Sequence, residues 1–106
     1  MLSTLLFASM AFANSQVLLD CNVSTGSDQQ VQVVQNDNAL TLRELKTSGL
    51  WKERSLSQQE WNKDGIALGE ESGTTTTLWK TPHGWWTETN SNGFKETAEA
   101  DCTKTL

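Results

Sequence analysis

The stretch Leu78-Trp79-Lys80-Thr81-Pro82-His83-Gly84-Trp85-Trp86 decides the fold, because it places a turn signal between two segments with strand character. Proline in the second position and glycine in the fourth position of residues 81–84 are typical of a type I turn. Residues on the two sides of such a turn lie opposite each other on antiparallel strands. We therefore predict a β-hairpin in which Trp79 and Trp86 form a cross-strand pair.

A second turn signal follows at Asn92-Gly93, the dipeptide that most strongly favours two-residue hairpin turns. Such a turn pairs Ser91 with Phe94 and sets the register of the last strand. Neighbouring side chains on a strand point to opposite faces, so this register assigns each residue to a face. The face that we predict to form the core holds Leu78, Trp85, Thr87, Phe94, Ala98, Ala100 and Cys102. The face that we predict to lie outside holds Trp79, Trp86, Glu88, Lys95, Thr97, Glu99 and Asp101.

The register of the last strand has one alternative. A three-residue loop over residues 91–93, with a glycine bulge, would slip that strand by one residue. Trp86 would then join the core and Trp85 would face outward. In both registers one of these adjacent tryptophans is exposed. An exposed tryptophan either binds a ligand or covers a turn or the open end of a barrel.

Alternating apolar residues between turn clusters predict further strands in the rest of the chain. They cover residues 16–23, 30–35, 39–45, 50–56 and 74–80. The first of these strands should bury one face, which holds Val17, Leu19, Cys21 and Val23.

Residues 57–62 allow two interpretations. Ser57 and Glu60 have the spacing of a capping box, which favours a single helical turn. If the segment is extended instead, Asp64-Gly65 forms a hairpin turn. In both cases we expect Trp61 to lie in the core.

Strands of this length separated by turns predict an all-β fold. We expect a small antiparallel meander that forms a barrel or a strongly curved sheet of about seven to eight strands. Cys21 and Cys102 are the two cysteines of the chain, and we expect one disulfide between them that joins the first and last strands. Such a link should close the barrel and so remove its free edges.

Residues 1–13 are predicted to be a secretory signal peptide, because an apolar run ends there in the pattern Ala11-Phe12-Ala13. Residues 14–106 then form a single small β domain. A secreted or periplasmic location follows from this interpretation and agrees with the expected disulfide. A lipid anchor on Cys21 is disfavoured, because Asp20 stands where a lipobox needs a small residue.

Charge and composition reduce the number of function classes that fit this sequence. The chain has 13 acidic and 8 basic residues and a net charge of −5, which disfavours binding to nucleic acid or to an anionic membrane surface. It suits a cationic partner, although a modest acidic charge also serves solubility. His83 is the one histidine and is expected in a turn, and no nucleophile-elbow pattern is present. We expect no metal, no cofactor and no catalytic residues.

These observations favour a small exported protein that acts by binding. The leading hypothesis is a protein–protein module, such as an inhibitor of a cationic secreted hydrolase like lysozyme. The first alternative is a carbohydrate- or peptidoglycan-binding module that stacks sugar on Trp79 and Trp86, and the second is a structural envelope protein without a ligand. The candidate binding surface consists of Trp79, Trp86, Glu88, Lys95 and Glu99.

The overall organisation resembles that of small bacterial inhibitors of c-type lysozymes. An export signal, an early cysteine, the strand with Trp85-Trp86 and a final cysteine carry this resemblance. It extends to architecture alone, because no inhibitory motif matches residue by residue. No residue role is therefore taken from that family.

Overall fold

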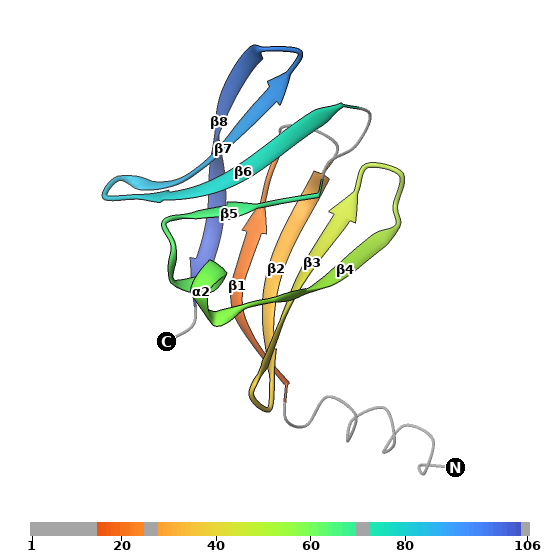
Figure 1. The fold of residues 1–106 in the computed structure, drawn as a ribbon, viewed down its shortest axis with the longest axis vertical. Helices are drawn as coiled ribbons and strands as arrows, with labels where there is room; N and C mark the ends of the chain where they lie inside the picture. Colours follow the sequence, from red (N-terminus) through yellow and green to blue (C-terminus); the bar gives the residue numbers. More distant parts are fainter. Residues whose placement is uncertain (1–14, 25–27, 70–72, 105–106) are drawn as a thin grey trace.

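The structure is a computed structural model that describes residues 15–24, 28–69 and 73–104. Its strands form one antiparallel sheet of eight strands that curls into a half-barrel (Figure 1). This is the all-β, strongly curved arrangement that the sequence predicts. The elements are β1 (Ser15–Asn22), β2 (Asp28–Asn36), β3 (Ala39–Lys46), β4 (Trp51–Leu56), α2 (Gln58–Asn62), β5 (Gly65–Ala67), β6 (Thr74–Thr81), β7 (Gly84–Ser91) and β8 (Phe94–Lys104).

The sheet consists of two meanders, and its strand order is β4-β3-β2-β1-β8-β7-β6-β5. We call β1–β4 the N-terminal half and β5–β8 the C-terminal half. They meet where β1 pairs with β8, over four residue pairs from Leu19–Lys104 to Asn22–Asp101. The pairing of β6 with β7 is twice as long, with eight pairs. The two halves therefore share a short junction in the middle of the sheet.

The Cys21–Cys102 disulfide crosslinks this junction, because the two cysteines are directly paired residues of β1 and β8. The predicted link between the first and last strands is thus confirmed. The expectation that it closes a barrel is wrong, since β1 and β8 are neighbours in the centre of the sheet and its edges are β4 and β5. The two meanders run outward from the junction, so the edges come from the middle of the chain.

Side chains bridge the gap between the two edge strands. On β4, Arg54 donates from Nη2 to the Ala67 carbonyl oxygen of β5 at 2.7 Å and from Nη1 to Glu60 Oε2 at 3.1 Å. On the neighbouring β3, the Glu44 carboxylate accepts from the Gly69 N–H at 3.0 and 3.1 Å. These contacts take the place of a strand ladder across the open side of the half-barrel.

The interior of the half-barrel is apolar over most of its length. Inward side chains of both halves form this core, and the fully buried ones include Leu19, Val33, Leu42 and Leu78. The predicted inward face of the last three strands is confirmed for the buried residues Leu78, Thr87 and Ala100.

A buried charged cluster accompanies the apolar core. Lys46 Nζ lies 2.7 Å from Asp28 Oδ1 and 3.3 Å from Glu44 Oε1, and each of the three side chains is at most 4% exposed. Burial raises the pKa of the Asp28 carboxyl to about 6, and Glu44 adds to this effect while Lys46 opposes it. Burial lowers the pKa of Lys46, but the hydrogen bond and charge of Asp28 and the charge of Glu44 raise it on balance.

Two residues that the sequence places in the core are exposed. Val17 is 40% exposed, because a β-bulge between Val17 and Leu19 turns it to the outer face and leaves Leu18 packed against the core. Phe94 is 68% exposed, because the β7–β8 hairpin extends beyond the rest of the sheet (Figure 1) and Phe94 lies next to its turn.

The segment before β5 is helical. The Glu60 N–H donates to Ser57 Oγ and the Ser57 N–H donates to Glu60 Oε1, both at 3.0 Å, which completes the capping box. The single helical turn α2 follows, and it decides between the two interpretations of residues 57–62. Trp61 on this turn is half-buried and packs against the core, as predicted.

The predicted strands agree with the observed ones to within a few residues, and β5 adds a short edge strand. The predicted signal peptide, residues 1–13, lies outside the described residues. In the ranges that the structure describes, no helix has the length and apolar character needed to cross a membrane.

Candidate functional site

The register of the two hairpins decides which tryptophans are exposed. Ser91 pairs with Phe94, and Asn92 and Gly93 between them have φ values of 53° and 83°, as a two-residue turn requires. Trp79 pairs with Trp86, whereas Trp85 faces Ala100 and packs against the core. The two-residue turn is therefore confirmed over the three-residue loop, and Trp86 is the outward member of the adjacent pair.

A row of paired residues crosses the outer face of the C-terminal half. It runs Gly65, Trp79, Trp86 and Glu99 over the strands β5, β6, β7 and β8. Trp79 is 41% and Trp86 36% exposed, and Glu99 beside them is also exposed. The middle of this face is thus an aromatic pair with a carboxylate next to it.

All five predicted binding residues lie on this same face. Glu88 is two residues beyond Trp86 on β7 and pairs with Thr97, and Lys95 on β8 pairs with Asn90. Glu88 is half-buried and Lys95 is exposed. We call the surface formed by Trp79, Trp86, Glu88, Lys95 and Glu99 the tryptophan face.

Gly65 contributes a contact that the sequence reasoning missed. A Cβ atom on Gly65 would lie 2.6–2.9 Å from three ring atoms of Trp79, so the indole rests directly on the backbone of β5. The only sequence signal was the turn dipeptide Asp64-Gly65. Trp79 therefore covers the start of β5 with one part of its ring and exposes the rest, while Trp86 lies on its other side in the row.

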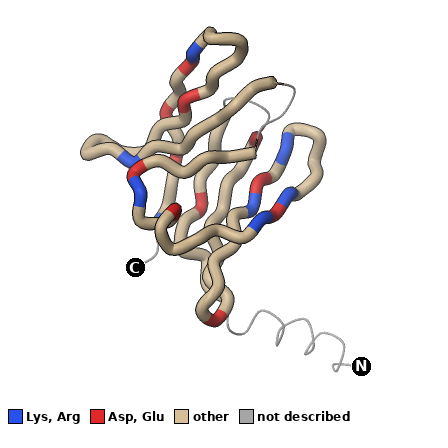
Figure 2. Tube along the Cα trace, in the orientation of Figure 1, with Lys and Arg blue, Asp and Glu red and all other residues tan. Residues whose placement is uncertain are grey.

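The charges on this face differ from those elsewhere in the sheet. Glu88, Glu99 and the neighbouring Asp101 form no ion pair with any residue that the structure describes. The ion pairs that are seen all join residues between Asp28 and Glu60. Figure 2 shows acidic positions grouped along β7 and β8. The tryptophan face thus combines apolar rings with carboxylates that are available to a cation.

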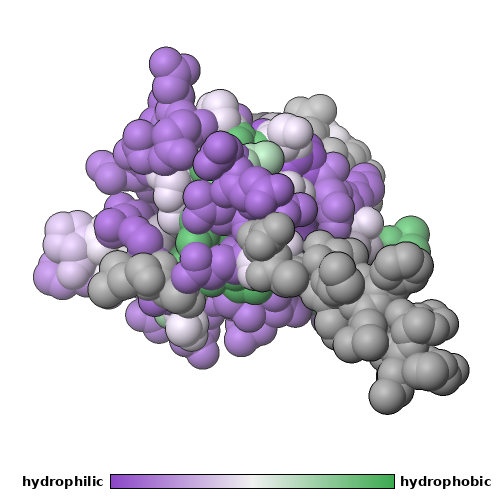
Figure 3. All heavy atoms as spheres, turned by 90° about the horizontal axis from the view of Figure 1, so that it is seen from below, coloured by the Kyte–Doolittle hydropathy of each residue, from purple (hydrophilic) through white to green (hydrophobic). Residues whose placement is uncertain are grey.

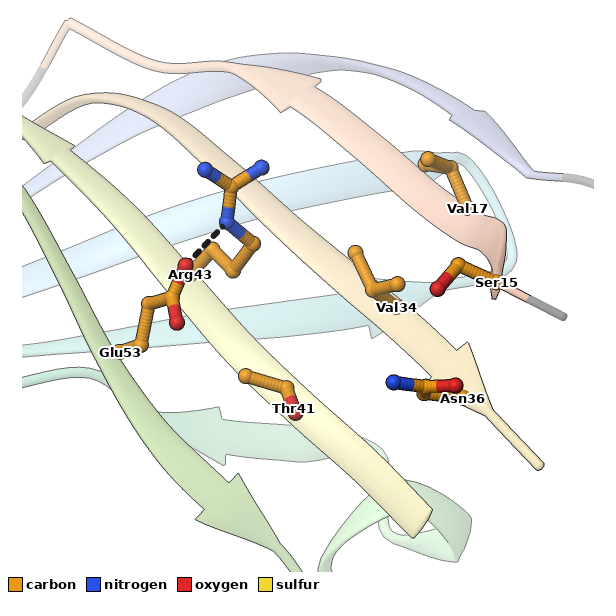
Figure 4. Close-up of a pocket in the computed structure, with 7 residues that line it drawn as sticks. All are labelled: Ser15, Val17, Val34, Asn36, Thr41, Arg43 and Glu53. Atoms are coloured by element: carbon orange, nitrogen blue, oxygen red, sulfur yellow. Dashed lines mark hydrogen bonds and ion pairs between the residues drawn. The ribbon is translucent and has the colours of Figure 1, made fainter. Parts of the chain in front are cut away.

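The outer face of the N-terminal half holds a different surface, a groove of about 360 Å³ (Figure 4). Arg43 in this groove is already paired, since its Nε lies 2.7 Å from Glu53 Oε2 and its Nη1 donates to Gln32 Oε1 at 2.9 Å. Its guanidinium also lies 4.3 Å from the ring centroid of Trp51. The groove therefore offers Val17 and other small side chains but no unpaired charge, which makes it the weaker candidate.

Metal chemistry has no evident site on either face. Within residues 15–24, 28–69 and 73–104, no three His, Cys, Asp or Glu side chains are grouped so that they could hold a metal ion. His83 lies in the exposed β6–β7 turn, where its N–H donates to Thr81 Oγ1 at 3.2 Å. The tryptophan face offers ring surfaces and carboxylate oxygens to a binding partner.

Comparisons with family models, curated proteins and solved structures found no match to this chain. The structure itself defines the class, a small β half-barrel whose central strands are joined by a disulfide. Its function has to be inferred from the geometry of its own surfaces.

Proposed function

We propose that this protein is an exported, non-catalytic binding protein that recognises a cationic protein through the tryptophan face. The single observation that carries the proposal is an exposed, directly paired Trp79 and Trp86 beside carboxylates without an ion pair among the described residues. Large aromatic side chains supply much of the binding energy at protein interfaces. Carboxylates around them attract a positively charged partner and orient it.

The shape of the surface favours a macromolecular partner. The tryptophan face is the outer side of a curled sheet, whereas small-molecule sites are concave and enclose most of their ligand. A second protein can cover such a face and bury both rings. A cationic secreted hydrolase such as lysozyme has a positive charge that is complementary to these carboxylates. We propose that this protein inhibits such a hydrolase.

The proposed location rests on two features. The disulfide agrees with a non-reducing, extracellular environment. The apolar segment 1–13 with its Ala-x-Ala end has the character of a secretory signal. Together they support a secreted or periplasmic protein, and a cationic hydrolase of the same compartment would be its partner.

Calorimetric titration of residues 14–106, with the disulfide formed, against a c-type lysozyme tests this proposal. The affinity should fall steeply between about 0.02 and 0.5 M salt, where the Debye length shrinks from roughly 20 Å to roughly 4 Å. Trp86→Ala should weaken binding by about tenfold or more. Trp51→Ala is the matched control, because Trp51 is 39% exposed on the other half of the sheet.

Two results would contradict the proposal. One is an equal loss of lysozyme binding in Trp51→Ala and Trp86→Ala, which would show that the tryptophan face is not the binding site. The other is salt-independent binding to peptidoglycan fragments that is lost in Trp86→Ala, without any binding to lysozyme. That second result would show that the two rings stack on sugar.

A further inference from the structure

A second concave site lies at the end of the half-barrel next to α2. It has a volume of about 220 Å³, and its walls come from α2, the residues that lead into β5, and the strands β5, β6, β7 and β8. Ligand sites occur preferentially at the mouths of β-barrels. We call this site the lysine pocket and define it by Trp61, Trp85, Lys63, Lys80 and Lys104.

The fold assembles the lysine pocket from residues that are far apart in the sequence. Lys80 and Trp85 are paired across β6 and β7, and Lys104 pairs with Leu19 at the end of β8. The helical turn α2 brings Trp61 over this end. The Lys80 N–H donates to the Asp64 carbonyl oxygen at 2.7 Å, which fixes the segment after α2 to β6.

The charge of the lysine pocket is unusual for this protein. Three of the 8 basic residues of a chain with net charge −5 line it. Among the described residues none of the three forms an ion pair, although Asp64 also lines the pocket. Lys104 Nζ instead lies 5.4 Å from the ring centroid of Trp61. Burial and the charge of Lys80 lower the pKa of Lys104, as expected for cations that lack a counter-charge.

The surface around the lysine pocket is mostly polar and charged. Figure 2 shows basic positions close to α2. Seen from below, the described surface is largely hydrophilic, with hydrophobic residues in small areas between polar ones and in one group at the right edge (Figure 3). A ligand at this end therefore meets mostly polar and charged side chains, with the two indole rings as its apolar contacts.

We propose that the lysine pocket binds a single sugar unit that carries a carboxylate. Lysine ammonium groups recognise the carboxylate, and the rings of Trp61 and Trp85 offer apolar surface to the C–H groups of the sugar. Asn62 and Asp64, which also line the pocket, offer hydrogen bonds to its hydroxyls. The volume of about 220 Å³ is of the order of one sugar ring, so the proposal is for a single unit.

This site is separate from the tryptophan face, because Lys80 and Trp85 point to the inner side of the sheet whereas Trp79 and Trp86 point to the outer side. The proposal therefore does not depend on a cationic protein partner.

Titration with glucuronate, glucose and sulfate at constant ionic strength, followed by NMR signals of the five tryptophan indole N–H groups, tests the proposal. Glucuronate should shift the signals of Trp61 and Trp85 saturably and leave those of Trp79 and Trp86 in place. Lys80→Gln and Lys104→Gln should each weaken glucuronate binding by about tenfold. Lys52→Gln, which removes an exposed lysine of β4 that belongs to neither binding surface, is the matched control and should bind as the parent does.

The following outcomes would overturn it. Sulfate that binds as tightly as glucuronate would show an anion site without sugar recognition. Glucose that binds as tightly would show that the lysines play no part. An equal loss in Lys52→Gln and Lys80→Gln would show a general charge effect. Thermal unfolding of each variant ensures that a loss of binding is read on folded protein.

Discussion

The two halves of the sheet use their charges in opposite ways. In the N-terminal half, Arg43 pairs with Glu53, Lys46 lies between Asp28 and Glu44, and Arg54 bridges to α2 and β5. In the C-terminal half, no ion pair joins residues that the structure describes. The tryptophan face presents carboxylates there, and the lysine pocket presents cations.

From this difference we infer that the two halves have different roles. Charges that are paired inside the N-terminal half help to hold the sheet together and close its open side. Charges of the C-terminal half that form no ion pair with a described residue can be neutralised by a partner, and they lie beside exposed or half-buried tryptophans. We infer that the N-terminal half is mainly a scaffold and that the C-terminal half carries the binding surfaces.

The largest expected effect is on stability, in the N-terminal half. Lys46→Met leaves Asp28 and Glu44 buried without their cation and should lower the free energy of unfolding by roughly 3–5 kcal/mol. Lys80→Gln, at the exposed end of β6, should change it by less than about 0.5 kcal/mol. Urea unfolding followed by tryptophan fluorescence measures both values. Equal losses of unfolding free energy in the two variants would show that charges in the two halves contribute equally to stability.

The second-largest loss of stability is expected at the junction between the two halves. Replacing both Cys21 and Cys102 by Ala should lower the free energy of unfolding by roughly 2–5 kcal/mol, because the disulfide crosslinks a pairing of only four residue pairs. Denaturant unfolding with and without reductant measures the effect. In reduced parent protein the loss should be similar, whereas a loss below about 1 kcal/mol would show that the halves hold together without the crosslink.

Acid should stabilise the protein through Asp28. The pKa of this carboxyl is about 6 in the fold, against an ordinary value of 3.8, so the folded state binds its proton more tightly than the unfolded chain does. The contribution of protonated Asp28 to the free energy of unfolding is fully present below about pH 4. It is lost as the pH rises through about 6, and the loss is roughly 1–3 kcal/mol. The Ser57 N–H stabilises the charged form of Glu60 and so lowers its pKa. This contribution to stability has the opposite pH dependence, because it is lost as the pH falls.

The difference between the parent protein and Asp28→Asn isolates the Asp28 effect from that of Glu60. The advantage of Asp28→Asn in unfolding free energy should grow between pH 4 and pH 7. An unchanged difference over that range would show that Asp28 ionises in the fold as it does in the unfolded chain.

An effect of about the same size as that of Asp28 is expected where Trp79 rests on Gly65. Gly65→Ala should lower the free energy of unfolding by about 1–3 kcal/mol, because the new Cβ would meet the indole ring at 2.6–2.9 Å. In a Trp79→Ala background the same substitution should cost close to nothing. A double-mutant cycle measures this coupling. Additive losses would mean that Gly65 is required for its backbone and not for the contact with Trp79.

Local turn chemistry made the C-terminal half predictable. The turn at residues 81–84 and the Asn92-Gly93 dipeptide set the registers that put Trp79 and Trp86 outside. The capping box of Ser57 and Glu60 likewise favours the observed helical turn α2. Each of these signals acts within a few residues, so the sequence carries it directly.

Non-local features could not be predicted in the same way. The pairing of β1 with β8 in the middle of the sheet, and not at a closing seam, depends on contacts between distant segments. The bulge after Val17 reverses its face without a glycine or proline to mark it. Glu44 and Lys46 lie on the inward side of β3 by the same alternation as Leu40 and Leu42. That Asp28 and Gly69 meet them there depends on distant segments. The lysine pocket combines Lys63, Lys80 and Lys104 from three separate segments.

We infer that the C-terminal half carries the binding surface. A lysozyme titration of residues 14–106, followed by the five tryptophan indole N–H signals, tests this inference. We predict that the signals of Trp79 and Trp86 shift or broaden first and that the signal of Trp51, on the N-terminal half, keeps its position. A response at Trp51 without one at Trp86 would contradict the account.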